Sequence, residues 1–135
     1  MGLGYLWDTN TVIYYLQIQL SQHAKEYLND VLKQSIPAIS VITEIELLSW
    51  NAPSEKDLEV IEEYIDETRI LGLEPEIRRK TAEIRRSAKI RLPDAIIAST
   101  AIVNDLILLT RNTKDFSRIE SLKMADPFYK DPGRS

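Results

Sequence analysis

The chain has 135 residues, 44% of them hydrophobic and 28% charged, which is the composition of one folded domain with a single core. This composition excludes disordered, collagenous and low-complexity proteins. The absence of cysteine excludes disulfides, thiolate zinc sites and a cysteine nucleophile, and we expect a cytoplasmic protein. The longest largely apolar run, residues 95–103, is too short to span a membrane, and residues 1–20 lack the features of a signal peptide.

The net charge of −4 conceals two oppositely charged segments. Residues 54–67 carry seven acidic residues and one lysine, whereas residues 78–91 carry seven basic residues and one glutamate. The small total argues against a protein that coats nucleic acid through bulk charge. The basic segment is nevertheless a candidate for a local contact with an anion.

The first third of the chain predicts two strands and two helices. Leu3 to Trp7 is a short apolar run that stops at Asp8-Thr9-Asn10, as in a buried strand followed by a helix cap. Helical spacing of apolar residues follows from Thr11 to Leu20 and again from Ser21 to Leu32. Ile36 to Ser40 predicts the second strand.

The middle of the chain continues the alternation. A short helix after the second strand is broken at Asn51-Ala52-Pro53, and Ser54 is a natural N-cap for the next helix. Ile70 to Leu73 predicts a third strand. Pro75 then stands where the first residue of a helix is expected.

The last third predicts a buried helix and two strands. The helix that opens at Leu92-Pro93-Asp94 is apolar nearly all round, and strands are expected over Ile107–Thr110 and Leu122–Ala125. Strands and helices joined by short connections predict an α/β domain over residues 1–126, with a mostly parallel sheet of about five strands flanked by helices. Residues 127–135, with two prolines and a glycine, are expected to be a loosely held tail.

Polar residues gather where the predicted strands end. Ligand sites of open parallel sheets form beyond the carboxyl ends of the strands. Carboxylates that converge there repel one another unless a cation binds between them, and oxygen ligands without cysteine favour Mg²⁺ or Mn²⁺ over zinc. The residues at these positions are Asp8, Thr43, Glu44, Glu46, Asp94, Asn112 and Asp115.

Each of these residues also has a purely structural interpretation. Asp8 can cap a helix, Asp94 can complement a helix N-terminus, Thr43-x-x-Glu46 is a capping-box pattern, and Asp115 can start a turn. Motifs of dinucleotide-binding, P-loop, zincin and serine-hydrolase proteins are missing from the sequence. The single histidine, His23, is expected to be a solvated surface residue.

Four segments carry a family resemblance: LWDTN at residues 6–10, SVITEIEL at 40–47, LPDAIIA at 92–98 and LTRNTKDF at 109–116. In this order and spacing they resemble PIN-domain nucleases of the VapC toxin type over nearly the whole chain. The resemblance implies a Mg²⁺- or Mn²⁺-dependent endoribonuclease. Its site residues would be Asp8, Glu46, Asp94, Asp115 and Asn112.

The resemblance also distinguishes neighbouring candidates. The family pattern Ser-x-x-Thr-x-x-Glu-Leu selects Glu46, which Leu47 follows, and leaves Glu44 outside the site. Many family members carry Asp where this chain has Asn112, so Asp115 is taken as the fourth carboxylate. Asn112 can instead hold a water or the scissile phosphate.

An acidic site needs basic residues to attract RNA. A solvated helix face is the alternative interpretation of the basic segment. Hydrolysis in such a site is expected to leave a 5′ phosphate and a 3′ hydroxyl. The residues expected to contact RNA are Arg78, Arg85, Arg86, Lys89, Arg91, Arg111 and Lys114.

The resemblance implies two protein partners, a second copy of the chain and a small cognate antitoxin that covers the acidic cleft. Aromatic and apolar residues on the first two predicted helices form either an exposed interface patch or part of the core; they are Tyr14, Tyr15, Tyr27, Leu28 and Val31. Asn112 suggests an alternative function, a PIN-like RNA- or protein-binding module without catalysis. A phosphoacceptor response-regulator domain fits less well, because Asp8 is the only acidic residue before residue 20.

Overall fold

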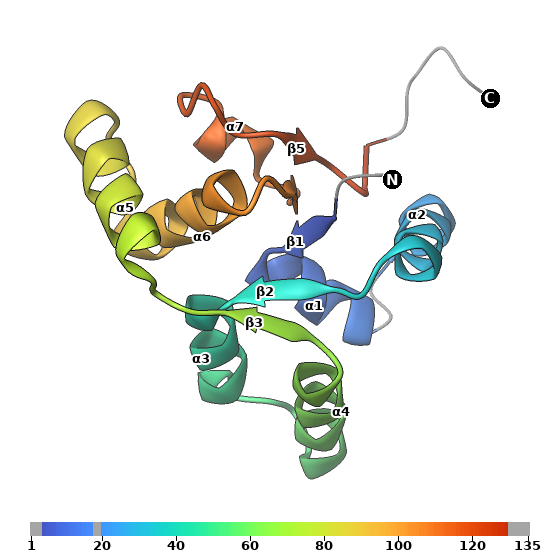
Figure 1. Cartoon of the computed structure of the whole chain (residues 1–135). Coiled ribbons are helices and arrows are strands. Elements are labelled where there is room, and N and C mark those ends of the chain that lie inside the picture. The colour runs from blue at the N-terminus through green and yellow to red at the C-terminus, as the bar shows by residue number, and fades with distance from the viewer. Residues whose placement is uncertain (1–3, 18–19, 130–135) are drawn as a thin grey trace.

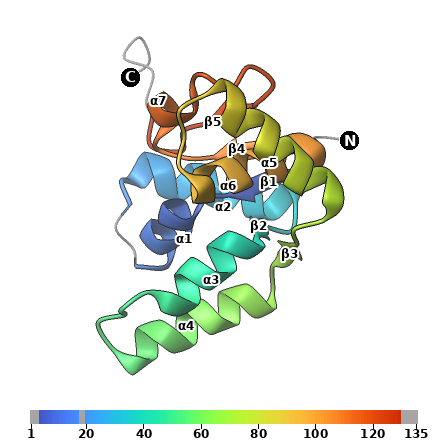
Figure 2. The same cartoon turned by 90° about the vertical axis from the view of Figure 1, so that its left-hand side faces the viewer.

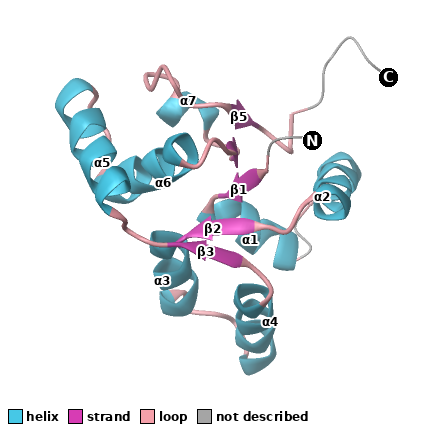
Figure 3. Cartoon of the chain, in the orientation of Figure 1, coloured by secondary structure: helices cyan, strands magenta, loops and turns pink. Residues whose placement is uncertain are grey.

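Short strands and helices alternate through residues 4–17 and 20–129, the part of the chain that the computed structural model describes (Figures 1 and 3). The strands are β1 (Tyr5–Trp7), β2 (Ala38–Ser40), β3 (Arg69–Leu71), β4 (Ile107–Leu109) and β5 (Met124–Ala125). The helices are α1 (Thr9–Leu16), α2 (Gln22–Gln34), α3 (Val41–Ser49), α4 (Glu55–Asp66), α5 (Pro75–Ser87), α6 (Leu92–Val103) and α7 (Thr113–Phe116).

The five strands form one sheet in the order β3-β2-β1-β4-β5, and every neighbouring pair is parallel. In the central strand, Leu6 is in register with Ala38 on one side and Leu108 on the other. The chain builds outward from β1 through β2 to β3 and then returns to the opposite side of β1 with β4. Parallel sheets carry ligand sites at such a reversal, beyond the carboxyl ends of the strands on either side.

Alternate strand residues face two separate cores, as the period of two in a strand requires. Leu6 and Leu108 belong to the core beneath α5, α6 and α7, whereas Trp7 and Leu109 belong to the core beneath α1, α2, α3 and α4. Figure 2 shows α5 on one side of the sheet and α4 on the other. The predicted α/β fold with a parallel five-stranded sheet is therefore confirmed.

The structure differs from the sequence predictions in three places. It contains the four-residue helix α7, which was not predicted. The helical spacing after Pro75 predicts a helix that includes Lys89, but α5 ends at Ser87. Leu28 and Val31 are 0% and 3% exposed and pack in the core, so they cannot form the predicted exposed patch. Core packing was the correct interpretation of these two residues.

Two predicted segments fall partly outside the described residues. The start of the first predicted strand, Leu3, is outside them, and so are residues 18–19 of the first predicted helix and 130–135 of the predicted tail. Phe128, in the part of the tail that is described, packs edge to face against Tyr14 with the ring centres 5.4 Å apart. Within residues 4–17 and 20–129, no helix combines the length and apolar content needed to cross a membrane.

Candidate active site

A cavity of about 180 Å³ lies at the carboxyl edge of the sheet, next to the reversal between β1 and β4. We call it the acidic cavity. All five residues predicted for the site line it, although they come from separate parts of the chain. The lining residues are Asp8, Thr9, Asn10, Glu46, Arg91, Asp94, Ile97, Asn112, Asp115 and Phe116.

Asp8 directly follows β1 and is only 6% exposed. Its Oδ1 accepts a hydrogen bond of 2.8 Å from the Thr11 N–H, so Asp8 is the N-cap of α1. Burial raises the pKa of the Asp8 carboxyl, while hydrogen bonds from Thr110 and Thr11 act in the opposite direction. Asp8 thus caps a helix and lines the acidic cavity with the same side chain.

Glu46 reaches the acidic cavity from α3. Its Oε1 accepts a hydrogen bond of 2.6 Å from the Thr9 hydroxyl on α1. The capping-box interpretation of Glu46 is wrong, because the N-cap of α3 is Ser40 and not Thr43. Glu44, two residues earlier on the same helix, is absent from the cavity lining.

Asp94 lies in the first turn of α6, where its negative charge also suits the helix dipole. Burial is the main cause that raises the pKa of the Asp94 carboxyl; Arg91 lowers it, and the charges of Glu46, Asp115 and Asp8 raise it further. These carboxylates therefore interact across the cavity. Among the described residues that line the cavity, Arg91 is the only cation.

The short helix α7 supplies the last two predicted site residues. Asp115 lies within α7, and Asn112 occupies its N-cap position without capping it through the side chain. The Asn112 N–H donates a 3.0 Å hydrogen bond to Thr110 Oγ1, and Thr110 also hydrogen-bonds Asp8. Both side chains are exposed at the cavity.

Sequence reasoning missed the two threonines that hold the carboxylates. Thr9 orients Glu46, and the fully buried Thr110 supports Asp8. The sequence marks these threonines only by their positions beside predicted site features. Thr9 directly follows Asp8, and Thr110 is the last residue of the predicted fourth strand. The hydrogen bond from Thr9 to Glu46 crosses 37 residues, and local patterns carry no information on such a contact.

The side chains fit a hard divalent cation by their chemistry. Among the described residues, no three His, Asp or Glu side chains stand close enough together to hold a metal ion between them. Mg²⁺, however, usually keeps several waters and binds through one or two carboxylates together with substrate phosphates. An acidic cavity in which burial, and then neighbouring carboxylates, raise the pKa values of Asp8 and Asp94 suits that mode of binding.

The predicted RNA-binding residues are all exposed, but only Arg91 lines the acidic cavity. Arg111 and Lys114 are chain neighbours of the cavity residues Asn112 and Asp115. Arg78 and Arg85 instead line a separate apolar groove between α5 and α6. Arg86 on α5 and Lys89 after it are absent from both linings.

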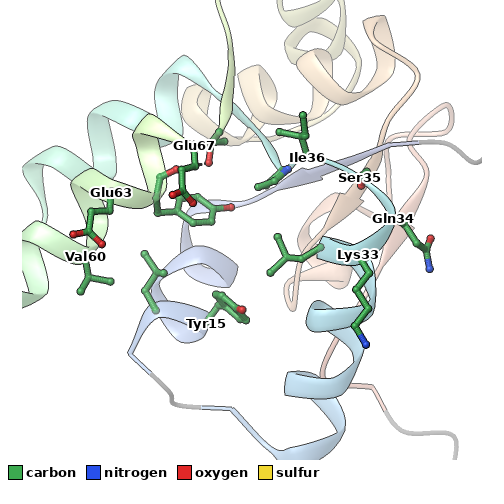
Figure 4. A pocket seen from close by; sticks show the side chains of 13 residues that line it. Tyr15, Lys33, Gln34, Ser35, Ile36, Val60, Glu63 and Glu67 are labelled. Carbon is green, nitrogen blue, oxygen red and sulfur yellow. Dashed lines mark hydrogen bonds between the residues drawn. The ribbon is translucent and has the colours of Figure 1, made fainter.

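A larger cavity, of about 620 Å³, lies between α1, α2 and α4 (Figure 4). Tyr15 lines it from α1, Lys33 and Gln34 from the end of α2, and Glu63 from α4, and Glu67 follows α4. None of the residues predicted for the site lines this cavity. The converging carboxylates distinguish the smaller acidic cavity as the candidate for chemistry.

Comparison with known proteins places these features in a family. Residues 5–122 match the PIN domain. Two relatives share the name tRNA(fMet)-specific endonuclease VapC. The one from Salmonella typhimurium is 29% identical and the one from Shigella flexneri 30% identical, each over 132 residues that cover 92% of this chain and 98% of the relative.

Solved structures agree with the sequence matches. VapBC from Salmonella typhimurium bound to DNA contains a chain that is 28% identical, with a TM-score of 0.77 over 93% of this chain and 99% of the other. VapBC2 from Rickettsia felis bound to a promoter DNA fragment gives 25% identity and a TM-score of 0.77 over 90% and 96%. The chain described here therefore belongs to the PIN domain family and is similar over nearly its whole length to VapC proteins.

Proposed function

We propose that this protein is a divalent-metal-dependent endoribonuclease and the toxin of a toxin–antitoxin pair. The observation that carries the proposal is the convergence of Asp8, Glu46, Asp94 and Asp115 from four helices or helix caps on one small cavity. The names of the relatives, tRNA(fMet)-specific endonuclease VapC, support RNA as the substrate. A cytoplasmic location agrees with such a substrate.

In this proposal Mg²⁺ or Mn²⁺ is held by one or two of the carboxylates of Asp8, Glu46, Asp94 and Asp115, together with waters and a phosphate of the substrate. A bound divalent ion supplies Lewis acidity, which lowers the pKa of water and stabilises the negative charge of a phosphodiester under attack. The protein supplies fixed positions for the oxygens. Asp8 is held by Thr11 and Thr110, and Glu46 is held by Thr9.

Two further residues act on the substrate itself in this proposal. The Arg91 guanidinium lowers the repulsion between the acidic cavity and an approaching phosphate, as it already lowers the pKa of Asp94. The Asn112 amide, unused as a helix cap, is free to donate to a phosphate oxygen at the cavity mouth. Hydrolysis leaves a 5′ phosphate and a 3′ hydroxyl.

The partners in this proposal are a small antitoxin and a second copy of the chain. The solved neighbours include VapBC complexes and a toxin–antitoxin complex from Klebsiella pneumoniae, which supports the antitoxin. Large apolar side chains remain exposed on α3, where Ile45 is 53% and Leu48 is 50% exposed. Leu73 and Leu92 are also exposed beside the groove between α5 and α6. A second copy of the chain that packs against these exposed apolar side chains of α3 and of the groove would remove them from water.

A cleavage assay tests the proposed activity. Purified protein is incubated with total bacterial RNA and Mg²⁺, with EDTA in a parallel sample and with Asp8→Asn as the inactive variant. Asparagine can still cap α1, so this variant keeps its fold. We expect cleavage by the wild type that both EDTA and Asp8→Asn abolish. RNA binding without metal-dependent cleavage would instead support the inactive binding module that Asn112 suggests.

A further inference from the structure

Arg111 lies against two aromatic rings from distant parts of the chain. Its guanidinium carbon is 4.8 Å from the centre of the Phe128 ring and 5.9 Å from the centre of the Tyr14 ring. The two rings pack edge to face with their centres 5.4 Å apart. We call these three side chains the arginine stack.

The arginine stack borders the acidic cavity. Arg111 directly precedes Asn112, and Tyr14 lies four residues after Asn10 on α1; both of these neighbours line the cavity. Residues four apart share a helix face and are separated by about one turn, roughly 5.4 Å along the axis. The stack is therefore about one helical turn from the cavity mouth.

The charge of Arg111 is held in place, and no acidic side chain in the described part of the chain forms an ion pair with it. The side chain of Arg111 is exposed. An arginine that stacks through the face of its guanidinium keeps the N–H edge available for hydrogen bonds. That edge matches the paired oxygens of a phosphate.

The arginines of α5 differ from Arg111 in this respect. Arg78 donates to the backbone carbonyl of Leu73 at 3.1 Å, and Arg85 donates to that of Ile90 at 3.4 Å. Both residues line the groove between α5 and α6, and neither lines the acidic cavity. Arg111 differs from them because aromatic rings hold its guanidinium and because it directly precedes the cavity residue Asn112.

The segment Asp126–Tyr129 holds the Phe128 ring in the stack. The Phe128 N–H donates a 2.8 Å hydrogen bond to Asp126 Oδ1, and the Tyr129 carbonyl oxygen is 2.7 Å from His23 Nε2 on α2. These contacts fix the backbone on both sides of the ring. The end of the described chain is therefore connected to the loop that carries Asn112.

We propose that Arg111 binds a backbone phosphate of the RNA beside the bond that is cleaved, and that Phe128 is a positioning residue that acts through Arg111. This inference rests on the proposed ribonuclease function and adds a defined contact to it. The Phe128 ring already occupies one face of the Arg111 guanidinium, where a base could otherwise stack. The N–H edge remains available, and this edge suits the oxygens of a phosphate. It strengthens binding of any RNA sequence and does not select a base.

RNA binding tests this proposal without interference from cleavage. Fluorescent transfer RNA is titrated with full-length protein in the Asp8→Asn background, and Kd is measured at several salt concentrations. Arg111→Ala is expected to raise Kd about tenfold and to reduce the slope of log Kd against log salt by about one. Phe128→Ala is expected to raise Kd about threefold, the size of an exposed cation–π contact. The matched control Lys56→Ala, on the exposed face of α4, removes one charge and is expected to leave Kd unchanged.

A double-mutant cycle separates positioning from general packing. Because Phe128 acts through Arg111, Phe128→Ala should add almost nothing in the Arg111→Ala background. Arg111→Lys should recover little affinity, since lysine lacks the planar fork. Phe128→Leu keeps apolar packing without a ring, and it should still lose affinity if the ring acts on the guanidinium.

The outcomes distinguish failure of this proposal from failure of the proposed function. If the Asp8→Asn protein binds RNA and Arg111→Ala binds as tightly as Lys56→Ala, the arginine stack has no role and only this inference is overturned. Additive effects of the Arg111 and Phe128 substitutions, or full recovery by lysine, also overturn it. If wild-type protein neither binds nor cleaves RNA, the proposed function fails and this inference fails with it.

Discussion

Thr9 on α1 donates a 2.6 Å hydrogen bond from its hydroxyl to Glu46 Oε1 on α3, across 37 residues of sequence. Asp8, the residue before Thr9, caps the same helix α1 with its own carboxylate. The first turn of α1 therefore supports two carboxylates of the acidic cavity. Asp8 caps this turn, and Thr9 within it orients Glu46. Thr9 Oγ1 is also 3.1 Å from the buried Thr43 hydroxyl, which limits its movement.

This contact predicts that Thr9→Val lowers the activity while the fold is retained. Valine has nearly the shape of threonine but cannot donate to Glu46, so the carboxylate loses its fixed position. Loss of a hydrogen bond to a metal-binding group typically costs about 10- to 100-fold. We expect a loss of about tenfold in cleavage rate, measured on RNA with Mg²⁺ at saturating and limiting concentrations.

Thr9→Ser is the matched control for this prediction. Serine keeps the hydroxyl and should retain most of the activity, with a Mg²⁺ requirement close to that of the wild type. A loss for serine with little loss for valine would assign the effect to packing of the methyl group and not to the hydrogen bond, and equal losses would show that the hydroxyl alone does not maintain the activity.

The burial of Asp94 beside other carboxylates predicts a stabilising substitution. Burial is the main cause that raises the pKa of Asp94, and the neighbouring carboxylates raise it further although Arg91 lowers it. Ionised Asp94 is therefore less favourable in the folded protein than in the unfolded chain. We expect Asp94→Asn to raise the Tm in EDTA, measured by calorimetry. Added Mg²⁺ should raise the Tm of the wild type more than that of the variant, because a ligand that binds the folded state stabilises it. A lower Tm for Asp94→Asn in EDTA would show that the carboxylate contributes to stability.

The exposed apolar side chains of α3 predict the effect of a charge on self-association. Leu48→Glu should convert a dimer into a monomer, because a carboxylate at the centre of an apolar contact is costly to bury. Ile36→Glu is the control, since Ile36 is also exposed, at 63%, but lies between α2 and β2. Light scattering coupled to size exclusion gives the masses. A wild-type monomer, or dimers for both variants, would contradict the role of this surface.

Much of the fold was predictable because the signals are local. Short apolar runs, helical spacing of apolar residues and helix caps identify the strands and most helices, and Ser54 and Pro75 begin their helices where expected. The gathering of Asp8 and Asn112 was also predictable, since parallel strands present their carboxyl ends at one edge. The parallel order of the strands is therefore enough to predict that Asp8 and Asn112 lie at the same edge of the sheet, even when no contact between them is known.

The remaining features depend on contacts that local patterns do not specify. The four residues of α7 are too few to establish a helical period. Leu28 and Val31 form the apolar face of an amphipathic helix, and such a face looks the same in sequence whether the core or a partner covers it. The support of Glu46 by Thr9 joins two helices, so it becomes visible only in three dimensions.

The central claim is that the acidic cavity cleaves RNA, and two glutamates on α3 test it most directly. Residues two apart on a helix are turned about 200° from each other, so Glu46 lines the cavity and Glu44 does not. The two substitutions Glu46→Gln and Glu44→Gln remove the same charge from the same helix. They differ only in which face of α3 loses it.

The decisive measurement is the rate of Mg²⁺-dependent RNA cleavage by these two variants, with circular dichroism to verify that each is folded. Loss of a carboxylate from the site should slow Glu46→Gln by more than about 100-fold. Glu44→Gln should remain within about threefold of the wild type, as expected for a substitution away from the reacting groups. Equal rates for the two variants, or a greater loss in Glu44→Gln, would contradict the assignment of the acidic cavity as the active site.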